Sequence, residues 1–170
     1  MPLVQGASSL LDVLAEERGQ TLSIDGDTSI HVEADGVILR QVVINLLDNA
    51  IKYSPQGGLV SVRVVRSDPG SACVEVEDCG PGIPPEHRDK VFDRFCRIDE
   101  ARSREAGGAG LGLALAKWGA EAHGGRLELN STNTGCIFRL VLPVSPHVNG
   151  KAFVETLAVQ PLSRLALDDD

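Results

Sequence analysis

The sequence predicts a two-layer α/β (α+β) sandwich, with helices on one face of a mixed, mostly antiparallel sheet. Two observations lead to this class. Short alternating segments come in pairs joined by turn residues, and helical patterns of apolar residues are placed between those pairs. The length of 170 residues favours one domain, and 42% hydrophobic with 24% charged residues is typical of a globular chain with one core.

Six segments are predicted to be strands, and most form hairpins with their neighbours in sequence. Strands 59–66 and 72–78 flank the turn Asp68-Pro69-Gly70, and 127–131 and 136–142 flank a turn at 132–135. The first pair, 21–24 and 29–32, lies around Asp25-Gly26-Asp27. Short turns make consecutive strands antiparallel neighbours.

Three helices are predicted, at 8–18, 35–53 and 111–123. Leu10, Leu11, Leu14 and Ala15 form the apolar stripe of the first helix. Asp35 is a good N-cap for the second, which Ser54-Pro55 ends, and Gly124-Gly125 stops the third.

The domain is placed at residues 1–146 and a tail at 147–170. A mobile loop is expected at 101–109, because that segment is charged and contains glycine. Within the tail, 153–167 is considered as a short helix. Packing on the domain, disorder and an origin outside the natural gene are all open for this tail.

Charge and cysteine usage limit the function classes. The formal net charge of −8 argues against nucleic acid as the main ligand, and an anionic ligand would need local positive charge and backbone N–H groups. The four cysteines form no Cys-x-x-Cys pair and are expected to be reduced thiols of a cytosolic protein. Neither a signal peptide nor a membrane-spanning apolar run is expected, and the chain is interpreted as cytoplasmic, alone or as part of a membrane receptor.

A polar stripe follows one side of the otherwise apolar helix 35–53. At the helical period, Gln41, Asn45, Asp48, Asn49 and Lys52 fall on one side. Asparagine is a poor helix former, so two of them on a buried helix are unusual for a solvated face. An amide oxygen suits Mg²⁺, and a lysine one turn on suits phosphate. A solvated face and a ligand site both remain open from this stripe alone.

An inward-pointing acid and a glycine turn follow the strand 72–78. Strand parity places Asp78 on the apolar, buried face, where a carboxylate needs a partner. It is either a turn cap or an acceptor for the exocyclic amine of adenine, a contact that guanine would not make. Gly80 and Gly82 would let a base approach the backbone.

A glycine-rich run, 107–112, precedes the third helix. Backbone N–H groups and the helix N-terminus there could bind an anion. The run is neither a dinucleotide fingerprint, because Leu113 occupies the third glycine position, nor a P-loop, because no Gly-Lys-Ser/Thr follows. Alone it is weak evidence.

Four segments together resemble the conserved boxes of sensor histidine kinases. The strings are LRQVVINLLDNAIKYSPQGG (39–58, N box), VEDCGPGIP (76–84, G1 box), VFDRFCRID (91–99, F box) and GGAGLGLALAKWGAEAHGG (107–125, G2 box). The resemblance implies the Bergerat ATP-binding fold, with ATP and Mg²⁺ as cofactors. The pair Phe92/Phe95 and His123-Gly124-Gly125 favour the kinases over the other branches of that fold.

The resemblance also implies roles for individual residues. Asn49, with Asn45 beside it, would ligate Mg²⁺, Lys52 would contact phosphate, and Tyr53 would lie against the base. Asp78 would recognise adenine. Phe92 and Phe95 would anchor the base of the ATP lid by packing. The nucleotide-binding set is Asn45, Asn49, Lys52, Tyr53, Asp78, Gly80, Gly82, Ile83, Arg102, Arg104, Gly108, Gly110, Leu111 and Gly112.

The chain departs from the family in its histidines. None of the four lies in a helix and precedes Glu or Asp, as the phosphoacceptor would, so no catalytic residue is assigned and His123 is interpreted as a helix cap. Cys96, where an aromatic residue is common, is a smaller departure. The expected function is transfer of the γ-phosphate of Mg-ATP to a histidine on a dimerisation and phosphoacceptor domain, in cis or in trans, and then to a response regulator.

Three alternatives are kept. They are a regulatory nucleotide-binding module without phosphotransfer, a serine kinase of the anti-sigma-factor type, and a purely structural domain. A monomer is expected, because the family dimerises through helices that this sequence does not show.

Overall fold

The computed structural model describes residues 3–27, 29–98, 109–144 and 154–157. Its main sheet has five strands in the order β1-β3-β4-β6-β5. β1 is parallel to β3, and every other neighbouring pair is antiparallel. The strands are β1 (Thr21–Gly26), β3 (Leu59–Asp68), β4 (Ser71–Glu77), β5 (Arg126–Thr132) and β6 (Gly135–Pro143).

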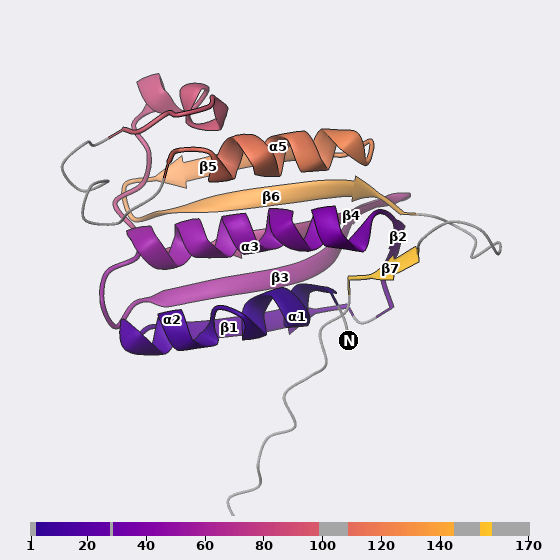
Figure 1. The fold of residues 1–170 in the computed structure, drawn as a ribbon, viewed down its shortest axis with the longest axis horizontal. Helices are drawn as coiled ribbons and strands as arrows, with labels where there is room; N and C mark the ends of the chain where they lie inside the picture. The colour runs from indigo at the N-terminus through magenta and orange to yellow at the C-terminus, as the bar shows by residue number, and fades with distance from the viewer. Residues whose placement is uncertain (1–2, 28, 99–108, 145–153, 158–170) are drawn as a thin grey trace, which may run out of the picture.

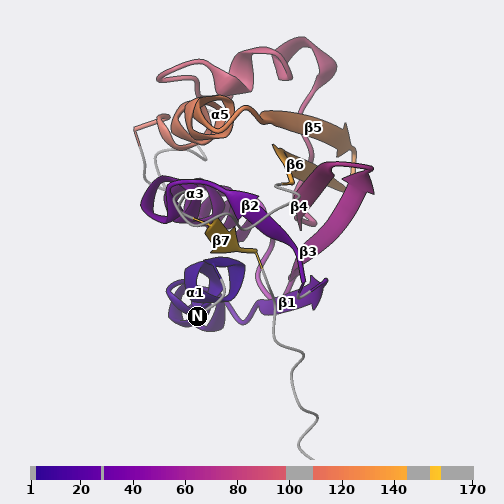
Figure 2. The same ribbon diagram turned by 90° about the vertical axis from the view of Figure 1, so that its right-hand side faces the viewer.

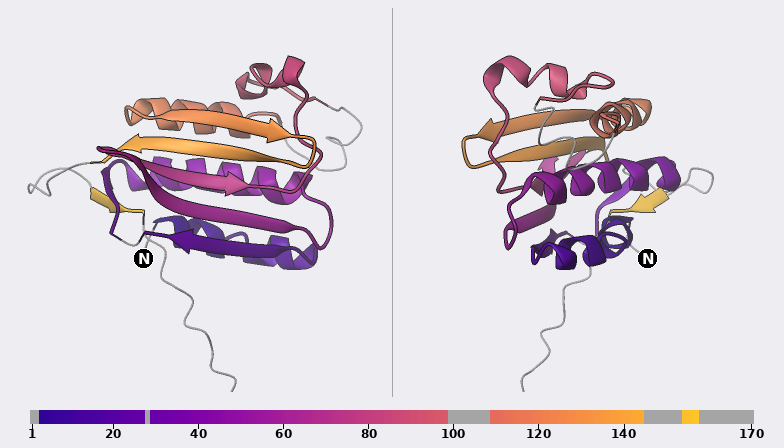
Figure 3. Two further views of the ribbon diagram at one scale, coloured as in Figure 1. Left: turned by 180° about the vertical axis from the view of Figure 1, so that it is seen from behind. Right: turned by 60° about the vertical axis from the view of Figure 1, so that its left-hand side comes forward.

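The helices lie together on one face of this sheet (Figures 1 and 2). Seen from behind, the strands stand in front of the helices (Figure 3), so the predicted two-layer sandwich is confirmed. The helices are α1 (Leu3–Ser9), α2 (Asp12–Glu17), α3 (Gly36–Tyr53) and α5 (Gly112–Ala122). Two 3-10 turns, Pro85–His87 and Lys90–Phe92, lie between β4 and α5.

α3 is the central helix, and its start agrees with the sequence. The Asp35 carboxylate accepts hydrogen bonds from the backbone N–H groups of Val37 and Ile38, which confirms the predicted N-cap. Residues at helical spacing, from Leu39 to Ile51, are fully buried between the sheet and the other helices. α3 therefore presents a fixed polar side at the edge of the core.

α3 and α5 run antiparallel in close contact. A Cβ added at Gly119 would come within 2.5 Å of Val42 Cγ2, so glycine permits the approach of the two helices. At the far end, His123 Nε2 accepts a hydrogen bond from the Asp35 N–H (3.0 Å), and His123 Nδ1 donates one to the Gly119 carbonyl (2.6 Å). His123 therefore caps α5, as predicted, and also joins it to the start of α3.

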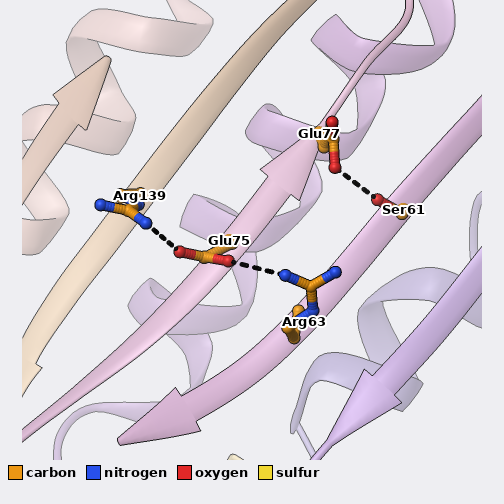
Figure 4. A network of polar contacts seen from close by, with 5 residues as sticks. All are labelled: Ser61, Arg63, Glu75, Glu77 and Arg139. Atoms are coloured by element: carbon orange, nitrogen blue, oxygen red, sulfur yellow. Dashed lines mark hydrogen bonds and ion pairs between the residues drawn. The ribbon is translucent and has the colours of Figure 1, made fainter. Parts of the chain in front are cut away.

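The uncovered face of the sheet is polar (Figure 4). Glu75 lies between Arg63 and Arg139, with N–O distances of 3.4 and 2.6 Å. Ser61 donates a hydrogen bond to Glu77 (3.3 Å). These cross-strand pairs explain how a sheet covered on one side only remains solvated on the other.

The first predicted helix, 8–18, is wrong as a single element. The structure has two short helices separated by a turn at Leu10 and Leu11, where the Leu11 N–H donates to the Ser8 carbonyl (2.8 Å). Leu10 is 65% exposed and is not part of the apolar stripe. The core instead takes Leu3, Val4 and Ala7, which lie before the predicted start.

The predicted hairpin of 21–24 with 29–32 is also wrong. β1 pairs with β3 in the main sheet, whereas β2 (His31–Glu33) pairs with β7 (Val154–Thr156) in a separate sheet. β7 begins inside the segment considered as a helix, so that interpretation is wrong for 154–156. Leu157, which follows β7, is fully buried. Of the expected mobile loop, 101–108 lies outside the described residues, and the boundary at 146 stays a prediction.

Candidate functional site

The polar stripe of α3 is internally hydrogen-bonded. Gln41 Nε2 donates to Asn45 Oδ1 (3.0 Å), and Lys52 Nζ lies 2.7 Å from Asp48 Oδ2. Both pairs join side chains four residues apart. Asn49, which is partly exposed, has no hydrogen-bond partner among the described residues, so its amide is available to a ligand.

The end of α3 is fixed by two side chains that the sequence did not reveal. Gln20 Nε2 donates to the carbonyls of Ile51 (3.0 Å), Ser54 (3.1 Å) and Pro55 (3.1 Å). Arg18 Nη2 donates to the Lys52 carbonyl (3.2 Å). The last carbonyls of a helix have no partners within it, so these contacts satisfy them and hold the turn that carries the site.

Asp78 follows β4 and points into the molecule, as strand parity predicts. It is only 6% exposed. Its Oδ1 accepts hydrogen bonds from the backbone N–H groups of Gly80 (2.9 Å) and Cys136 (3.2 Å). Its Oδ2 has no hydrogen-bond partner in the described part of the chain, so one acceptor oxygen remains available.

Burial decides the electrostatic character of Asp78. It raises the pKa of the carboxyl above its ordinary value, and the charge of Glu77 raises it further. The two backbone hydrogen bonds from Gly80 and Cys136 act in the opposite direction but are outweighed. A carboxylate held in this way accepts a hydrogen bond from a ligand more readily than one in water.

The glycine turn after Asp78 is required by the protein's own packing. Gly82 has a φ of 74°, and a Cβ there would overlap the carbonyl oxygen of Thr132. A Cβ at Gly80 would lie 2.8 Å from the carbonyl oxygen of Tyr53. The turn therefore packs closely against both the end of α3 and the β5–β6 hairpin. This packing explains the need for glycine at these two positions better than the expected approach of a base to the backbone does.

The same turn has a side-chain anchor that sequence reasoning missed. The Ser131 hydroxyl accepts a hydrogen bond from the Ile83 N–H (2.7 Å) and lies 3.3 Å from Cys136 Sγ. Ile83 itself is partly buried and packs on the core. Only the paired β5 and β6 bring Ser131 to this place, so no local pattern could have identified it.

The start of α5 lies against the polar stripe. A Cβ at Gly112 would be 3.9 Å from the Cβ and Cγ atoms of Asn45. Leu111 occupies the N-cap position and makes no side-chain cap hydrogen bond. No side chain among the described residues caps the first N–H groups of α5, and such N–H groups suit an anion.

The residues before and after 99–108 meet through their backbones. The Phe95 N–H donates to the Gly110 carbonyl (2.9 Å), and Phe95 has a φ of 63°, unfavourable for an aromatic residue. The Phe95 ring is 68% exposed, so the prediction that it packs is wrong. Phe92 does pack, edge-on to Phe138 with centroids 6.4 Å apart. Lys117 Nζ lies 5.8 Å from the Phe92 ring centroid.

The structure thus brings three parts of the predicted site together. Asn45 meets Gly112, and the end of α3 at Tyr53 meets Gly80 beside Asp78. The site positions Arg102, Arg104 and Gly108 lie outside the described residues. No group of three or more His, Cys, Asp or Glu that could hold a metal occurs in the described ranges. None of the helices described is long and apolar enough to cross a membrane.

This geometry agrees with comparisons with known proteins. The family model for histidine kinase-, DNA gyrase B- and HSP90-like ATPases matches residues 34–146. The chain belongs to this family. The match covers α3, the Asp78 turn and α5, which are the elements that form the site.

Relatives within the family are sensor histidine kinases. The chain is 45% identical over 106 residues to WalK of Bacillus subtilis, and 41% identical over 132 residues to CusS of Escherichia coli O157:H7. These alignments cover 62% and 78% of this chain but only 17% and 27% of the relatives. The chain therefore corresponds to the ATPase domain of such kinases and to a minor part of their length.

Solved structures support the same fold. The mycobacterial sensor histidine kinase MprB is similar with a TM-score of 0.72 and 35% identity, covering 86% of this chain and 97% of that one. Full-length ShkA, solved in complex with AMPPNP, gives a TM-score of 0.75 and 28% identity, covering 86% of this chain and 30% of that one. The mixed five-stranded sheet with helices on one face is thus the fold of histidine kinase catalytic domains.

Proposed function

We propose that this domain binds Mg-ATP and presents its γ-phosphate to a histidine on a dimerisation and phosphoacceptor domain outside this chain. A response regulator would then receive the phosphoryl group. Membership of the ATPase family and similarity to sensor histidine kinases support the proposal. The structural observation that carries it is the buried Asp78, which has one oxygen fixed and one free.

The purine side of the site is built around Asp78. Its free Oδ2 is an acceptor for the exocyclic amine of adenine, whereas guanine would direct a carbonyl oxygen at the same atom. Tyr53, 42% exposed at the end of α3, lies next to the Gly80 turn and offers a ring for the base to contact. Adenine is therefore the expected base.

The phosphate side is formed by α3 and the start of α5. The first N–H groups of α5, which receive no side-chain cap from Leu111, and the Lys52 ammonium suit phosphate oxygens. Asn49 has a free amide oxygen, a ligand type that Mg²⁺ accepts while keeping waters and phosphate oxygens in its shell. The donor set therefore fits a magnesium ion shared with the nucleotide, and the ion would neutralise charge on the phosphates. Arg102, Arg104 and Gly108 remain proposed additional contacts.

The contribution of this domain to the reaction is positioning and charge neutralisation, which dominate phosphoryl transfer. None of its four histidines is followed by Glu or Asp, as the phosphoacceptor would be. Both ring nitrogens of His123 are used, by Asp35 and Gly119. The acceptor histidine is therefore assigned to the separate domain.

The first test is calorimetric titration of the parent and of Asp78→Asn with ATP and GTP in the presence of Mg²⁺. The parent should bind ATP, and the substitution should weaken binding at least about ten-fold, because an amide that bonds to Gly80 and Cys136 turns an NH₂ group toward the base. Glu77→Gln, an exposed neighbour outside the site, is the matched control and should bind as the parent does. Failure of the parent to bind ATP would exclude the proposed site.

The second test mixes the ATP-binding parent with a cognate phosphoacceptor domain and labelled ATP. Acid-labile label on histidine is expected. Acid-stable phosphoserine would instead indicate a serine kinase. No protein label, despite ATP binding, would indicate a regulatory module.

A further inference from the structure

The polar stripe of α3 contains an acid, Asp48, to which the proposed function gives no role. Its carboxylate is about one third exposed and lies 2.7 Å from Lys52 Nζ, the ammonium proposed to meet phosphate. A negative charge so close to a triphosphate is unfavourable unless a cation is also bound. The position of Asp48 therefore needs an explanation.

Such a cation needs oxygen ligands from the stripe, and Asn45 is a poor candidate to supply one. Its Oδ1 already accepts a hydrogen bond from Gln41 Nε2 (3.0 Å). The remaining group, Nδ2, is a buried donor that has no hydrogen-bond partner among the described residues. A donor repels a cation, so Asn45 in this arrangement is a poor ligand for the metal.

Two oxygen-bearing side chains of the stripe remain for the cation, Asn49 and Asp48. Asn49 has no partner, and Asp48 shares only Oδ2 with Lys52, which leaves Oδ1 available in the described part of the molecule. Magnesium is usually bound by one or two carboxylates together with phosphate oxygens and waters. The carboxylate of Asp48 is therefore the charged oxygen ligand for magnesium that the other side chains of the stripe do not supply.

We propose that Asp48 makes the site select metal-bound over metal-free nucleotide. The inference rests on the proposed function. Without the metal, Asp48 repels the triphosphate and competes with it for Lys52. With the metal, the nucleotide carries two fewer negative charges, and the carboxylate attracts the cation. The same acid thus weakens one complex and strengthens the other.

The test compares the parent and Asp48→Asn in two calorimetric titrations with ATP, one in excess Mg²⁺ and one in EDTA. In EDTA the substitution should raise the affinity roughly three- to ten-fold, the size expected for one charge contact at a partly exposed site. In Mg²⁺ it should leave the affinity unchanged or lower it. The ratio of the ATP affinity in Mg²⁺ to the ATP affinity in EDTA should therefore be lower for Asp48→Asn than for the parent.

A charge control separates a local effect from a global one. Asp25→Asn removes the same charge from β1, where the apolar neighbours Leu22 and Ile24 face the core and Asp25 faces the open side of the sheet. For Asp25→Asn, the ratio of the ATP affinity in Mg²⁺ to that in EDTA should equal the ratio of the parent. Thermal melting of each variant confirms folding, and the effect of Asp48→Asn on the ratio should shrink at high salt.

The outcomes are distinct. An equal loss of affinity in both titrations would mean that Asp48 only positions Lys52, and this would overturn the inference. An unchanged ratio would overturn it too, while leaving the proposed function intact. No ATP binding by the parent in either titration would overturn the proposed function and this inference with it.

Discussion

The proposed purine side and the proposed phosphate side of the site are built in opposite ways. On the purine side, Asp78 is held by backbone groups that include Cys136, 58 residues away, and Gly82 is pressed against Thr132. On the phosphate side, side chains of one helix pair with each other four residues apart, as Lys52 does with Asp48. The purine side is therefore preformed, whereas the phosphate side must exchange partners when a ligand arrives.

The largest expected effect comes from breaking the preformed side with Gly82→Ala. The new Cβ would overlap the Thr132 carbonyl at a φ of 74°, and the free energy of unfolding should fall by about 3–4 kcal/mol. Gly57→Ala is the matched control, because Gly57 has a φ of 72° and nothing within 4 Å of an added Cβ. It should cost only about 1 kcal/mol, from backbone strain alone. Urea denaturation measures both, and equal losses would mean that the close contact with Thr132 is unimportant.

A smaller loss is expected from His123→Ala, which separates the far ends of α3 and α5. Removing the ring leaves the Asp35 N–H and the Gly119 carbonyl without their partners, at a cost of about 1–2 kcal/mol in unfolding free energy. ATP affinity should fall more than adenosine affinity, because only the phosphate side depends on the placement of α5 against α3. His87→Ala, whose ring makes no hydrogen bond to the described residues, is the control. Equal loss of both affinities would contradict the division into two sides.

Asp78→Asn should change stability in the opposite direction. Burial raises the pKa of this carboxyl, so the folded state binds its proton more tightly than the unfolded state does, and the charged form destabilises the fold at neutral pH. An amide oxygen can keep both backbone hydrogen bonds without the charge. The variant should therefore gain roughly 1 kcal/mol at pH 7 while losing ATP.

The pH dependence of that gain is the check. The penalty of the parent is present above its raised pKa and is lost as the pH falls through that value toward the ordinary 3.8. Melting temperatures of parent and Asp78→Asn should therefore converge in acid. A variant that is less stable than the parent at pH 7 would show that the carboxylate stabilises the fold.

The smallest effect is expected on the open face of the sheet. Arg63→Ala removes one of the two ion pairs of Glu75 (Figure 4), and Arg63 is 55% exposed, so stability should change by less than about 1 kcal/mol. ATP affinity should not change, because this face lies opposite the site. A measurable loss of affinity would show that the sheet transmits changes between its faces.

The sequence predicted best what depends on neighbours along the chain. The N-cap at Asp35 and the inward direction of Asp78 follow from local rules, a capping preference and strand parity, and both are confirmed. The polar stripe was also identified correctly as one side of α3. What the stripe does remains a proposal, but one of its residues, Asn45, does lie beside Gly112, as a shared site requires.

Apart from the local break in the first predicted helix, what failed depends on partners distant in the chain. β2 pairs with β7, more than a hundred residues later, instead of with β1, and no turn signal encodes that choice. Gln20 and Ser131 act on backbone groups that only the complete fold brings near them. The resemblance implied that Phe95 packs at the base of the lid, but its ring is exposed and its backbone N–H donates to the Gly110 carbonyl. For β2, long-range pairing overrode the local preference for a hairpin.

The bond from Cys136 to Asp78 also sets when the site can first exist. The two residues are 58 positions apart, so at roughly 5–20 residues per second a ribosome needs roughly 3–12 s to pass from one to the other. During that interval α3 and β4 have been made, but the acid lacks one of its two donors. Nucleotide could then assist folding of this domain only after β6 has joined the sheet.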